Sequence, residues 1–447
     1  MKRLLLFIML AETLLSFTQD NLPKLLDRYM QAQATQNDFC GTVLVAKKGK
    51  VIYEKSFGLA NREWNIPNTS ESRYWTCSLT KQFTAAAILQ LEEQGKLSTS
   101  DKLSKYFPDY PKGDQVTLHM LLNHTSGIQD VSNNPKWFNI NHNLPVDKMK
   151  DTLIATFKNK PYDFEPGTGW RYSNSAYILL GYIIEKASGQ TYYDYMQKNV
   201  LAKADMANSG FLQHDRIVPK LVNGYSLLPE GWKRADSFPL NIGFSAGNIY
   251  ATAEDLLKWR LALASGKIIG PQALKKMNTP NQPDRGAGYG IFVENFLGQK
   301  VLEHQGALFG FNTYMGEYPE ADVHIIVLTN RDTNLDFVPK GLAGIMFGKD
   351  VTPYYKKKPF QFSGNVNRFA GNFRSDELPF PVNVVEKNNK LYLQLGREIE
   401  LVPESQTKFY IDEQDVDIRL EYVTDASGQV SRVYFIGSGI KNELKKA

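Results

Sequence analysis

Strand patterns near both ends of the first 330 residues constrain the fold more than any other feature of this sequence. Alternating apolar stretches at residues 41–46 and 51–58 flank a Lys-Lys-Gly-Lys turn, which predicts a β-hairpin. Strand patterns return only late, at residues 289–294, 301–304, 312–318 and 324–328. Helical patterns fill much of the chain between them. We therefore expect an α+β fold in which one antiparallel sheet, formed by N- and C-terminal strands, is flanked by helices and a helical subdomain.

A second, smaller domain is indicated after residue 351. Three lysines and a proline at residues 356–359 are typical of a linker. Beyond them, short alternating stretches are separated by turn residues, at residues 382–385, 390–394, 408–411, 418–423 and 430–436. This pattern predicts a small all-β C-terminal domain, a barrel or a sandwich. With 447 residues, the chain also exceeds what one hydrophobic core usually carries.

The N-terminus has the pattern of a secretory signal peptide. Lys2 and Arg3 precede an apolar stretch, and small residues at 16 and 18 predict cleavage near Gln19. Glu12 interrupts the apolar stretch, so a first amphipathic helix of a cytoplasmic protein is the alternative. The expected organisation is a signal peptide (1–18), a main domain (19–350), a linker (351–358) and a β-barrel (359–447). Such a protein is exported, to the periplasm or beyond.

Composition excludes several classes of function. The net charge of +5 is spread along the chain without a basic block that would bind nucleic acid. The six histidines and two cysteines show no metal-ligand spacing, so we expect no metal and no cofactor. No later stretch approaches the ~20 apolar residues of a stable membrane span. Export would permit a disulfide between Cys40 and Cys77. The oligomeric state is left open.

Ser78 and Lys81 stand at the start of a helix that is apolar on almost every side. From Lys81 the sequence continues with three alanines, Ile and Leu, with no Gly or Pro before Gly95. Residues three apart lie on one helix face, and an unpaired buried ammonium is costly. The pair therefore predicts a serine nucleophile beside an amine that can take its proton. Alternatively, Ser78 is a helix cap and Lys81 a solvated side chain, because S-x-x-K is common by chance.

A turn-rich loop at residues 164–174 offers a second proton carrier. Tyr172 could act as an acid or base if Lys81 lowers its pKa. Asn174 could donate a hydrogen bond to a substrate carbonyl. Taken alone, Tyr172 could equally be a core aromatic residue.

The end of a predicted strand at residues 303–307 offers groups that could bind substrate. His304 could donate to a substrate carboxylate or to Tyr172, and Gly306 would let the backbone approach substrate closely. The backbone N–H groups of Ser78 and Ala307 could then form an oxyanion hole. Taken alone, His304 could be a hydrogen-bonded histidine of the strand.

Residues 243–247 satisfy G-x-S-x-G, the nucleophile elbow of α/β-hydrolases. That motif requires a buried strand directly before it and a helix directly after it. The preceding residues are polar and include Pro239, and the next predicted helix begins only at Thr252. We expect Ser245 to lie in a turn that lines the site.

In this order and spacing, the motifs resemble those of the serine β-lactamase and penicillin-binding-protein superfamily, in its class C-like branch of β-lactamases, D-Ala-D-Ala carboxypeptidases and esterases. The matching stretches are residues 78–81 for S-x-x-K, 172–174 for Y-x-N and 304–306 for H-x-G, with 121–127 and 245–248 as further signatures. The resemblance covers about residues 20 to 345. The C-terminal stretch is similar to lipocalin-like domains.

The resemblance implies a β-lactamase/transpeptidase-like fold and acyl transfer. Ser78 would be the nucleophile, Lys81 and Tyr172 the proton relay. The substrate-binding residues would be Asn174, His304, Gly306 and Ala307. Substrates would be amides or esters of the D-alanyl peptide and β-lactam class. Since His304 replaces a permanently charged Lys, we expect a peptidase, amidase or esterase rather than efficient β-lactam hydrolysis. The alternatives are a small-ester esterase, and a penicillin- or peptide-sensing protein that is acylated without turnover.

Overall fold

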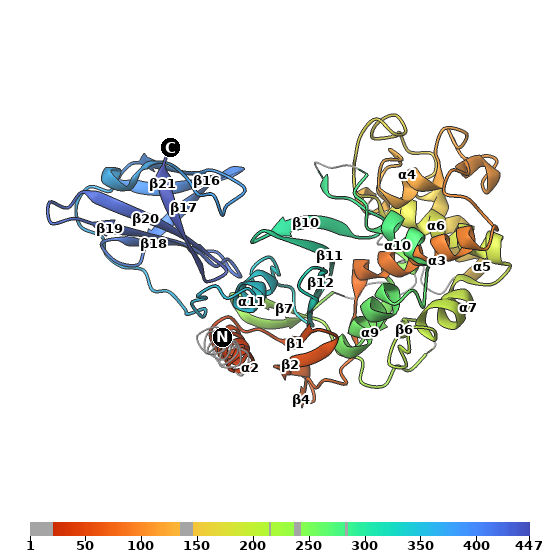
Figure 1. Ribbon diagram of the computed structural model, residues 1–447, viewed down its shortest axis with the longest axis horizontal. Helices are drawn as coiled ribbons and strands as arrows, with labels where there is room; N and C mark the ends of the chain where they lie inside the picture. The colour runs from red at the N-terminus through yellow and green to blue at the C-terminus, as the bar shows by residue number, and fades with distance from the viewer. Residues whose placement is uncertain (1–20, 135–145, 214–215, 237–242, 282–284) are drawn as a thin grey trace, which may run out of the picture. The chain divides into compact units, whose positions relative to one another are not determined.

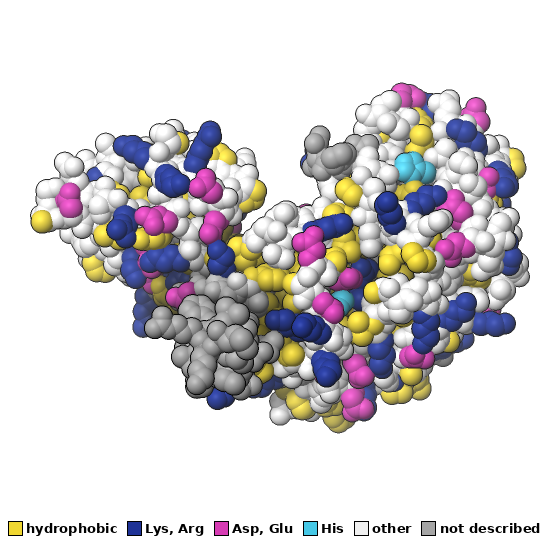
Figure 2. Space-filling view, viewed as in Figure 1, with side chains coloured by type: hydrophobic (Ala, Val, Ile, Leu, Met, Phe, Trp, Pro, Cys, Tyr) yellow, Lys and Arg dark blue, Asp and Glu magenta, His cyan; other side chains and the backbone are white. Residues whose placement is uncertain are grey.

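The computed structural model describes residues 21–134, 146–213, 216–236, 243–281 and 285–447. The predicted signal peptide lies outside these residues. The chain divides into two compact units, one of residues 40–333 and one that combines residues 1–39 with 334–447. On the face in view in Figure 2, Lys and Arg side chains are interspersed with Asp and Glu, in line with the even charge distribution of the sequence.

The larger unit contains a six-stranded antiparallel sheet (Figure 1), in the order β10-β11-β12-β13-β1-β2. Its strands are β1 (Gly41–Lys47), β2 (Lys50–Phe57), β10 (Phe292–Phe296), β11 (Gln299–Leu308), β12 (Phe311–Tyr318) and β13 (Val323–Thr329). The early hairpin joins the late strands where β1 pairs with β13, with Val43 opposite Val327. Every residue of β13 is buried, which suits the apolar run from Ile325 to Leu328 in its sequence. The prediction of a sheet that joins distant ends of the chain is confirmed.

Helices pack against this sheet and against one another. α9 (Ala253–Ala264) contacts β1 and β13, and α3 (Thr80–Glu93) contacts α6 (Asn174–Ser188) and α8 (Phe244–Gly247). Every residue of α3 from Thr80 to Leu91 is buried, as its all-round apolar sequence predicted. This helix therefore forms the middle of the core that positions the residues beside it.

The other elements of the larger unit are short. They are β3 (Leu59–Asn61), β4 (Ile66–Pro67), β5 (Tyr74–Trp75), α4 (Leu118–Leu122), α5 (Val146–Ala155), α7 (Tyr192–Met196), β6 (Gly210–Phe211), β7 (Tyr225–Leu228), β8 (Gly231–Arg234), β9 (Ile249–Ala251) and α10 (Pro271–Met277). Helix α5 lies in a stretch that is rich in polar residues. Its buried Met149 and Leu153 are four residues apart, a helical spacing that polar neighbours concealed.

The second unit contains a closed antiparallel barrel of eight strands. They are β14 (Gly371–Arg374), β15 (Val382–Lys387), β16 (Lys390–Leu395), β17 (Arg397–Pro403), β18 (Lys408–Ile411), β19 (Ile418–Thr424), β20 (Val430–Gly437) and β21 (Ile440–Lys446). Phe369, Phe409 and Leu420 are among the side chains that fill its core. The predicted lipocalin-like all-β domain is therefore present as an eight-stranded barrel. The sequence located five strands and missed β14, β17 and β21, whose many charged or polar residues mask the alternation.

The same unit holds two helices and the segment before the barrel. α2 (Leu22–Gln36) and α11 (Val338–Met346) pack together, and α2 buries Leu26, Tyr29 and Met30 at helical spacing. The segment between α11 and the barrel packs along barrel strands. Val351 forms a β-bridge with Ile440, and the N–H of Phe360 donates to the carbonyl of Pro403 at 2.8 Å. Across the described residues, no helix is both long and apolar enough to cross a membrane.

Candidate active site

Ser78 stands on a 3-10 turn (Cys77–Leu79) directly before α3. The N–H of Thr76 donates to the carbonyl of Ile249 at 2.9 Å, which ties the chain to β9 just before this turn. Cys77 then has a φ of +51°, in the left-handed region that non-glycine residues seldom adopt. This sharp change of direction leaves Ser78 partly exposed although its neighbours on both sides are buried.

Lys81 lies in the first turn of α3, is fully buried and contacts three oxygen atoms. Its Nζ is 3.1 Å from Ser78 Oγ, 2.8 Å from Asn174 Oδ1 and 2.7 Å from the carbonyl oxygen of Ala246. The last two oxygens can only accept, so each takes one N–H of Lys81. Burial lowers the pKa of Lys81 to about 7, although Asp130 opposes this. A neutral Lys81 can therefore turn its lone pair toward the Ser78 hydroxyl while it donates to both carbonyl groups.

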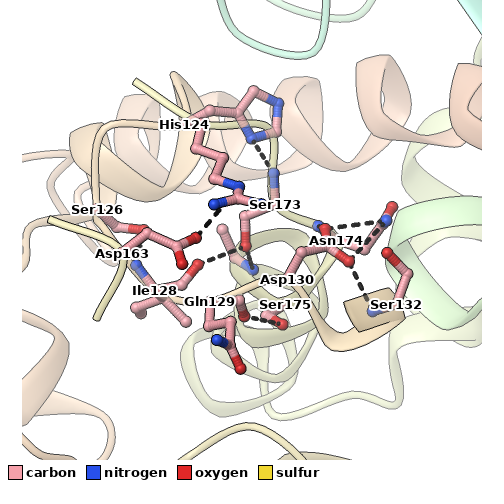
Figure 3. Close-up of polar contacts among 12 residues, drawn as sticks. His124, Ser126, Ile128, Gln129, Asp130, Ser132, Asp163, Ser173, Asn174 and Ser175 are labelled. Atoms are coloured by element: carbon pink, nitrogen blue, oxygen red, sulfur yellow. Dashed lines mark hydrogen bonds and ion pairs between the residues drawn. The ribbon is translucent and has the colours of Figure 1, made fainter. Parts of the chain in front are cut away.

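Asn174 is the first residue of α6, and its side-chain amide is held from two sides. Oδ1 accepts from Lys81. Nδ2 donates to Asp130 Oδ2 at 3.1 Å, as Figure 3 shows. Asp130 also accepts from the backbone N–H of Asn174 at 2.5 Å and from that of Ser132 at 2.7 Å. One hydrogen of Nδ2 is thus used by Asp130, and the second is the one that remains for the predicted bond to a substrate carbonyl.

The ring of Tyr172 lies close to the side chains of Lys81 and His124. Lys81 Nζ lies 4.8 Å from its ring centroid, and the ring of His124 lies 4.6 Å from it, centroid to centroid. Burial raises the pKa of Tyr172 above its usual value, and the hydroxyl of Ser78 opposes this rise. The sequence suggested that Lys81 could lower the pKa of Tyr172, whereas in the folded chain this pKa is raised. Tyr172 keeps its proton at neutral pH, because a buried phenolate is more costly than a buried phenol.

His304 lies on β11 and is buried, with 3% of its surface exposed. Its Nδ1 donates to the carbonyl of Gln305, and its buried Nε2 has no hydrogen-bond partner among the described residues. Burial lowers the pKa of His304 to about 3, and the nearby Lys81 acts in the same direction. The neutral ring has no N–H left to donate to a substrate carboxylate, which is the role that the sequence suggested.

Gly306 and Ala307 bring the edge of β11 beside the turn that holds Ser78. A Cβ at Gly306 would lie 2.4 Å from the carbonyl oxygen of Thr76 and 2.5 Å from Thr313 Oγ1, so only glycine permits this approach. The close approach that Gly306 permits is therefore to the backbone of Thr76, whereas the sequence suggested an approach to substrate. Ala307 follows and lines the same cavity as Ser78, as the predicted oxyanion hole requires.

A cavity of about 630 Å³ brings the predicted site residues together. Ser78, Tyr172, Asn174, His304 and Ala307 line it. Its apolar wall is formed by Ile178, Phe292, Leu308 and Phe309. Among the described residues that line it, Glu294 and Glu303 carry charge and no Lys or Arg is present. The cavity therefore fits an apolar group beside Ser78 and offers no lining cation to a carboxylate.

Ser245 does not have the exposure that a nucleophile elbow requires. It is fully buried in α8, and its Oγ donates to the carbonyl of Tyr177 at 2.8 Å. A strand, β9, follows α8 instead of the helix of the motif. Ser245 is therefore part of a short helix and does not line the cavity, unlike the expected turn residue, whereas the neighbouring Gly243, Ala246 and Gly247 do line it.

Among the described residues the cysteines form no disulfide and no metal-ligand cluster is found, although Cys77 lines the cavity. Cys40 and Cys77 are both buried as free thiols, so the disulfide that export would permit is not formed. Within the ranges that the structure describes, no three His, Cys, Asp or Glu side chains lie close enough together to hold a metal ion.

Asp130 is the residue of this site that the sequence analysis missed. It follows the signature at residues 121–127 by three positions, in a stretch of mixed polar composition. Nothing in the local pattern separates it from a surface carboxylate. Its burial (6% exposed) and its bonds to Asn174 arise only from the folded chain.

Comparisons with known proteins identify the family of this chain. The family model described as Beta-lactamase matches residues 25–345. A penicillin-binding protein of Bacillus subtilis is 28% identical over 92% of this chain and 96% of its own length. The crystal structure of a penicillin-binding protein from Bacillus halodurans matches with a TM-score of 0.63 and 31% identity, over 73% of this chain and 97% of that one. An octameric penicillin-binding protein homologue from Pyrococcus abyssi matches with a TM-score of 0.66 and 27% identity, over 94% of this chain and 99% of that one.

Proposed function

The chain belongs to the beta-lactamase family, and we propose that it is a serine hydrolase that forms an acyl-enzyme on Ser78. The observation that carries the proposal is the buried Lys81, whose Nζ lies 3.1 Å from Ser78 Oγ. Its pKa of about 7 leaves a large neutral fraction at physiological pH. A general base is most effective when its pKa is near the working pH.

The reaction follows from the states of the two proton carriers. Ser78 Oγ attacks the substrate carbonyl carbon while Lys81 takes the hydroxyl proton, and the backbone N–H groups of Ser78 and Ala307 hold the oxyanion. Tyr172, which is protonated, gives its proton to the leaving amine or alkoxide and receives one from Lys81. Water then attacks the ester carbonyl and gives a proton to these carriers, the bond between the acyl carbon and Ser78 Oγ breaks, the carriers protonate Ser78 Oγ, and the free acid leaves.

The substrates are amides or esters related to D-alanyl peptides and β-lactams. The names of the relatives in the Bacillus species and in Pyrococcus support recognition of penicillins. The apolar wall of Ile178, Phe292, Leu308 and Phe309 suits an apolar substituent next to the scissile carbonyl.

A small-ester esterase is the second candidate, and one observation favours it. His304 is neutral, and the described residues that line the cavity include no Lys or Arg. A neutral ester needs no cation, whereas a penicillin or a C-terminal D-alanine brings a carboxylate. The third possibility, a sensor that is acylated without turnover, differs from both in the lifetime of the acyl-enzyme.

The test is intact-protein mass spectrometry after incubation with benzylpenicillin, in parallel with p-nitrophenyl acetate. Wild type is compared with Ser78→Ala, and Ser245→Ala is the matched control because it removes the other candidate serine. We expect adducts on wild type and on Ser245→Ala, and none on Ser78→Ala. An adduct on Ser78→Ala would overturn the assignment of the nucleophile.

The time course separates the three candidates. Decay of the penicilloyl adduct with release of product indicates a hydrolase of the β-lactam class. A persistent adduct indicates a sensor. Acetylation and turnover of the ester without a penicilloyl adduct indicates an esterase.

A further inference from the structure

We propose that Asp130 is a positioning residue that holds the amide of Asn174 so that its oxygen faces Lys81, and thereby keeps Lys81 beside Ser78. The proposal rests on the proposed function, because it concerns the proton carrier of the nucleophile. Asp130 does not touch the reacting atoms. It acts through Asn174, and through its charge.

The contacts of Asp130 are those of an ionised carboxylate. It accepts hydrogen bonds from three N–H groups: the backbone and side-chain N–H of Asn174, and the backbone N–H of Ser132. Asn174 begins α6, a helix of 15 residues whose positive end stabilises a negative charge there. Among the described residues, no Lys or Arg forms an ion pair with Asp130. Its charge is therefore balanced by dipoles and is available to Lys81.

This carboxylate decides which way the Asn174 amide points. The two ends of an amide are nearly equal in size, but a carboxylate can only accept, so it selects the NH₂ end. The oxygen is then left to accept from Lys81 Nζ at 2.8 Å. If the amide were reversed, its NH₂ group would face the Lys81 ammonium, and two donors would meet. Asp130 thus excludes the orientation in which Lys81 would lose a partner.

The loop that carries Asp130 is tied to the start of α6 on both sides of Asn174 (Figure 3). The N–H of Ser173 donates to His124 Nδ1 at 3.1 Å, and its hydroxyl donates to the carbonyl of Ile128 at 3.1 Å. The hydroxyl of Ser175 donates to the carbonyl of Gln129 at 2.8 Å. These bonds on both sides of Asn174 fix the position of Asp130 relative to Asn174.

The charge of Asp130 also acts on Lys81 directly. The titratable side chains around Lys81 are Asp130, Cys77, His124, His304, Tyr172 and Tyr177. Burial keeps both histidines neutral and raises the pKa values of the thiol and of the two phenols. Asp130 is therefore the negative charge of this group. Its removal must make the Lys81 ammonium less stable.

The experiment uses the full chain and the nearly isosteric variant Asp130→Asn. The titration of Lys81 is followed by ¹³Cε NMR, with the signal assigned from its loss in Lys81→Met. The rate at which diisopropyl fluorophosphate modifies Ser78 is measured across the same pH range. We expect the Lys81 midpoint to fall by about 0.5 to 1 pH unit. The plateau rate of Ser78 modification should fall about tenfold or more, because the amide can now reverse.

Asp163→Asn is the matched control. This carboxylate lies in the same region (Figure 3), but its Oδ2 pairs with Arg171 Nε at 3.4 Å instead of with Asn174. We expect an unchanged Lys81 midpoint and an unchanged rate. Equal shifts in both variants would show a general loss of nearby charge and would overturn the specific role of Asp130.

A second variant keeps the proposal falsifiable if Asp130→Asn folds poorly. Asn174→Ala cuts the side-chain link but leaves Asp130 its two backbone donors, so the loop stays capped. In this background, adding Asp130→Asn should slow Ser78 modification by less than about threefold, because coupled residues are not additive. A full tenfold further loss would overturn the proposal.

The two proposals fail in different ways. If the Lys81 midpoint moves as expected but wild type is not modified on Ser78, the proposed hydrolase is wrong and the positioning role stands. If wild type is modified and Asp130→Asn matches it in both midpoint and rate, the positioning role is wrong and the hydrolase stands.

Discussion

A buried lysine in each of the two units shows how the same side chain serves different purposes. In the barrel unit, Lys357 Nζ lies 3.2 Å from Asp417 Oδ1, and each side chain is 3% exposed. In the larger unit, Lys81 is fully buried, and its nearest partners are the oxygens of Ser78, Asn174 and Ala246. Lys81 reaches its carboxylate, Asp130, only through an amide.

Distance accounts for the difference. At an effective dielectric constant of about 20, two unit charges 4 Å apart attract by about 4 kcal/mol, and this halves when the distance doubles. Burial lowers the pKa of both lysines, but Asp417 opposes this in direct contact with Lys357. A carboxylate in contact makes a structural ion pair. A carboxylate that is linked to the lysine through an intervening side chain, as Asp130 is through Asn174, positions the lysine but leaves it able to lose and regain a proton.

The largest expected effect comes from replacing the two lysines in turn. Lys81→Met should slow acylation of Ser78 by about 10³-fold or more, because it removes the general base. Lys357→Met should leave the rate within about twofold, since its partners are structural. Stopped-flow hydrolysis of p-nitrophenyl acetate measures both. Similar losses in the two variants would break the comparison.

Asp417→Asn should affect stability instead of activity. It leaves Lys357 buried without its charge partner, so the free energy of unfolding should fall by about 3 kcal/mol. Urea unfolding monitored by circular dichroism measures this. In the double variant with Lys357→Met the loss should be smaller, since one buried cation fewer is left without its partner, although Arg419, whose Nε lies 3.7 Å from Asp417 Oδ1, remains. An unchanged urea midpoint in Asp417→Asn would contradict the structural role of the pair.

The tyrosines beside the two lysines make a matched pair of hydroxyl deletions. Lys81 Nζ is 4.8 Å from the ring centroid of Tyr172, and Lys357 Nζ is 4.4 Å from that of Tyr354. Both Tyr→Phe changes keep the ring and remove only the hydroxyl. Tyr172→Phe should lower kcat by about 100-fold because its proton is transferred, whereas Tyr354→Phe should leave kcat unchanged. If Tyr172→Phe retained wild-type turnover with every amide and ester tried, the proton-relay role would be wrong.

The smallest expected effect is that of pH near neutrality. Lys81 works as the neutral base, so acylation should be about half-maximal at pH 7 and fall about tenfold for each further unit of acidity. The pKa of Lys81 is depressed in the folded state, so the unfolded chain binds more protons between pH 7 and 10.5 and stability should rise with pH in this window. Lys81→Met should flatten that rise, whereas Lys357→Met should leave the part due to Lys81 in place. A pH-independent acylation rate between pH 5 and 9 would argue against a titrating Lys81.

The sequence by itself determined the elements and the chemical groups of this protein. The all-round apolar run after Lys81 predicted a helix that is buried on every side, and α3 is buried from Thr80 to Leu91. Alternating patterns predicted the β1–β2 hairpin and most strands of the sheet and the barrel. These features depend on periodicity within a few residues, which a sequence displays directly. Strands with many charged residues, such as β17, escaped the same reasoning.

Only the tertiary structure decided the states of those groups. A role for Tyr172 as acid or base was conditional on a pKa lowered by Lys81, yet burial raises that pKa. His304 is neutral, and its N–H already donates to the carbonyl of Gln305. Asp130 had no distinguishing local pattern, although it lies against Asn174 in the folded chain. A pKa depends on burial and on charges brought together from distant positions, and neither exists until the chain has folded.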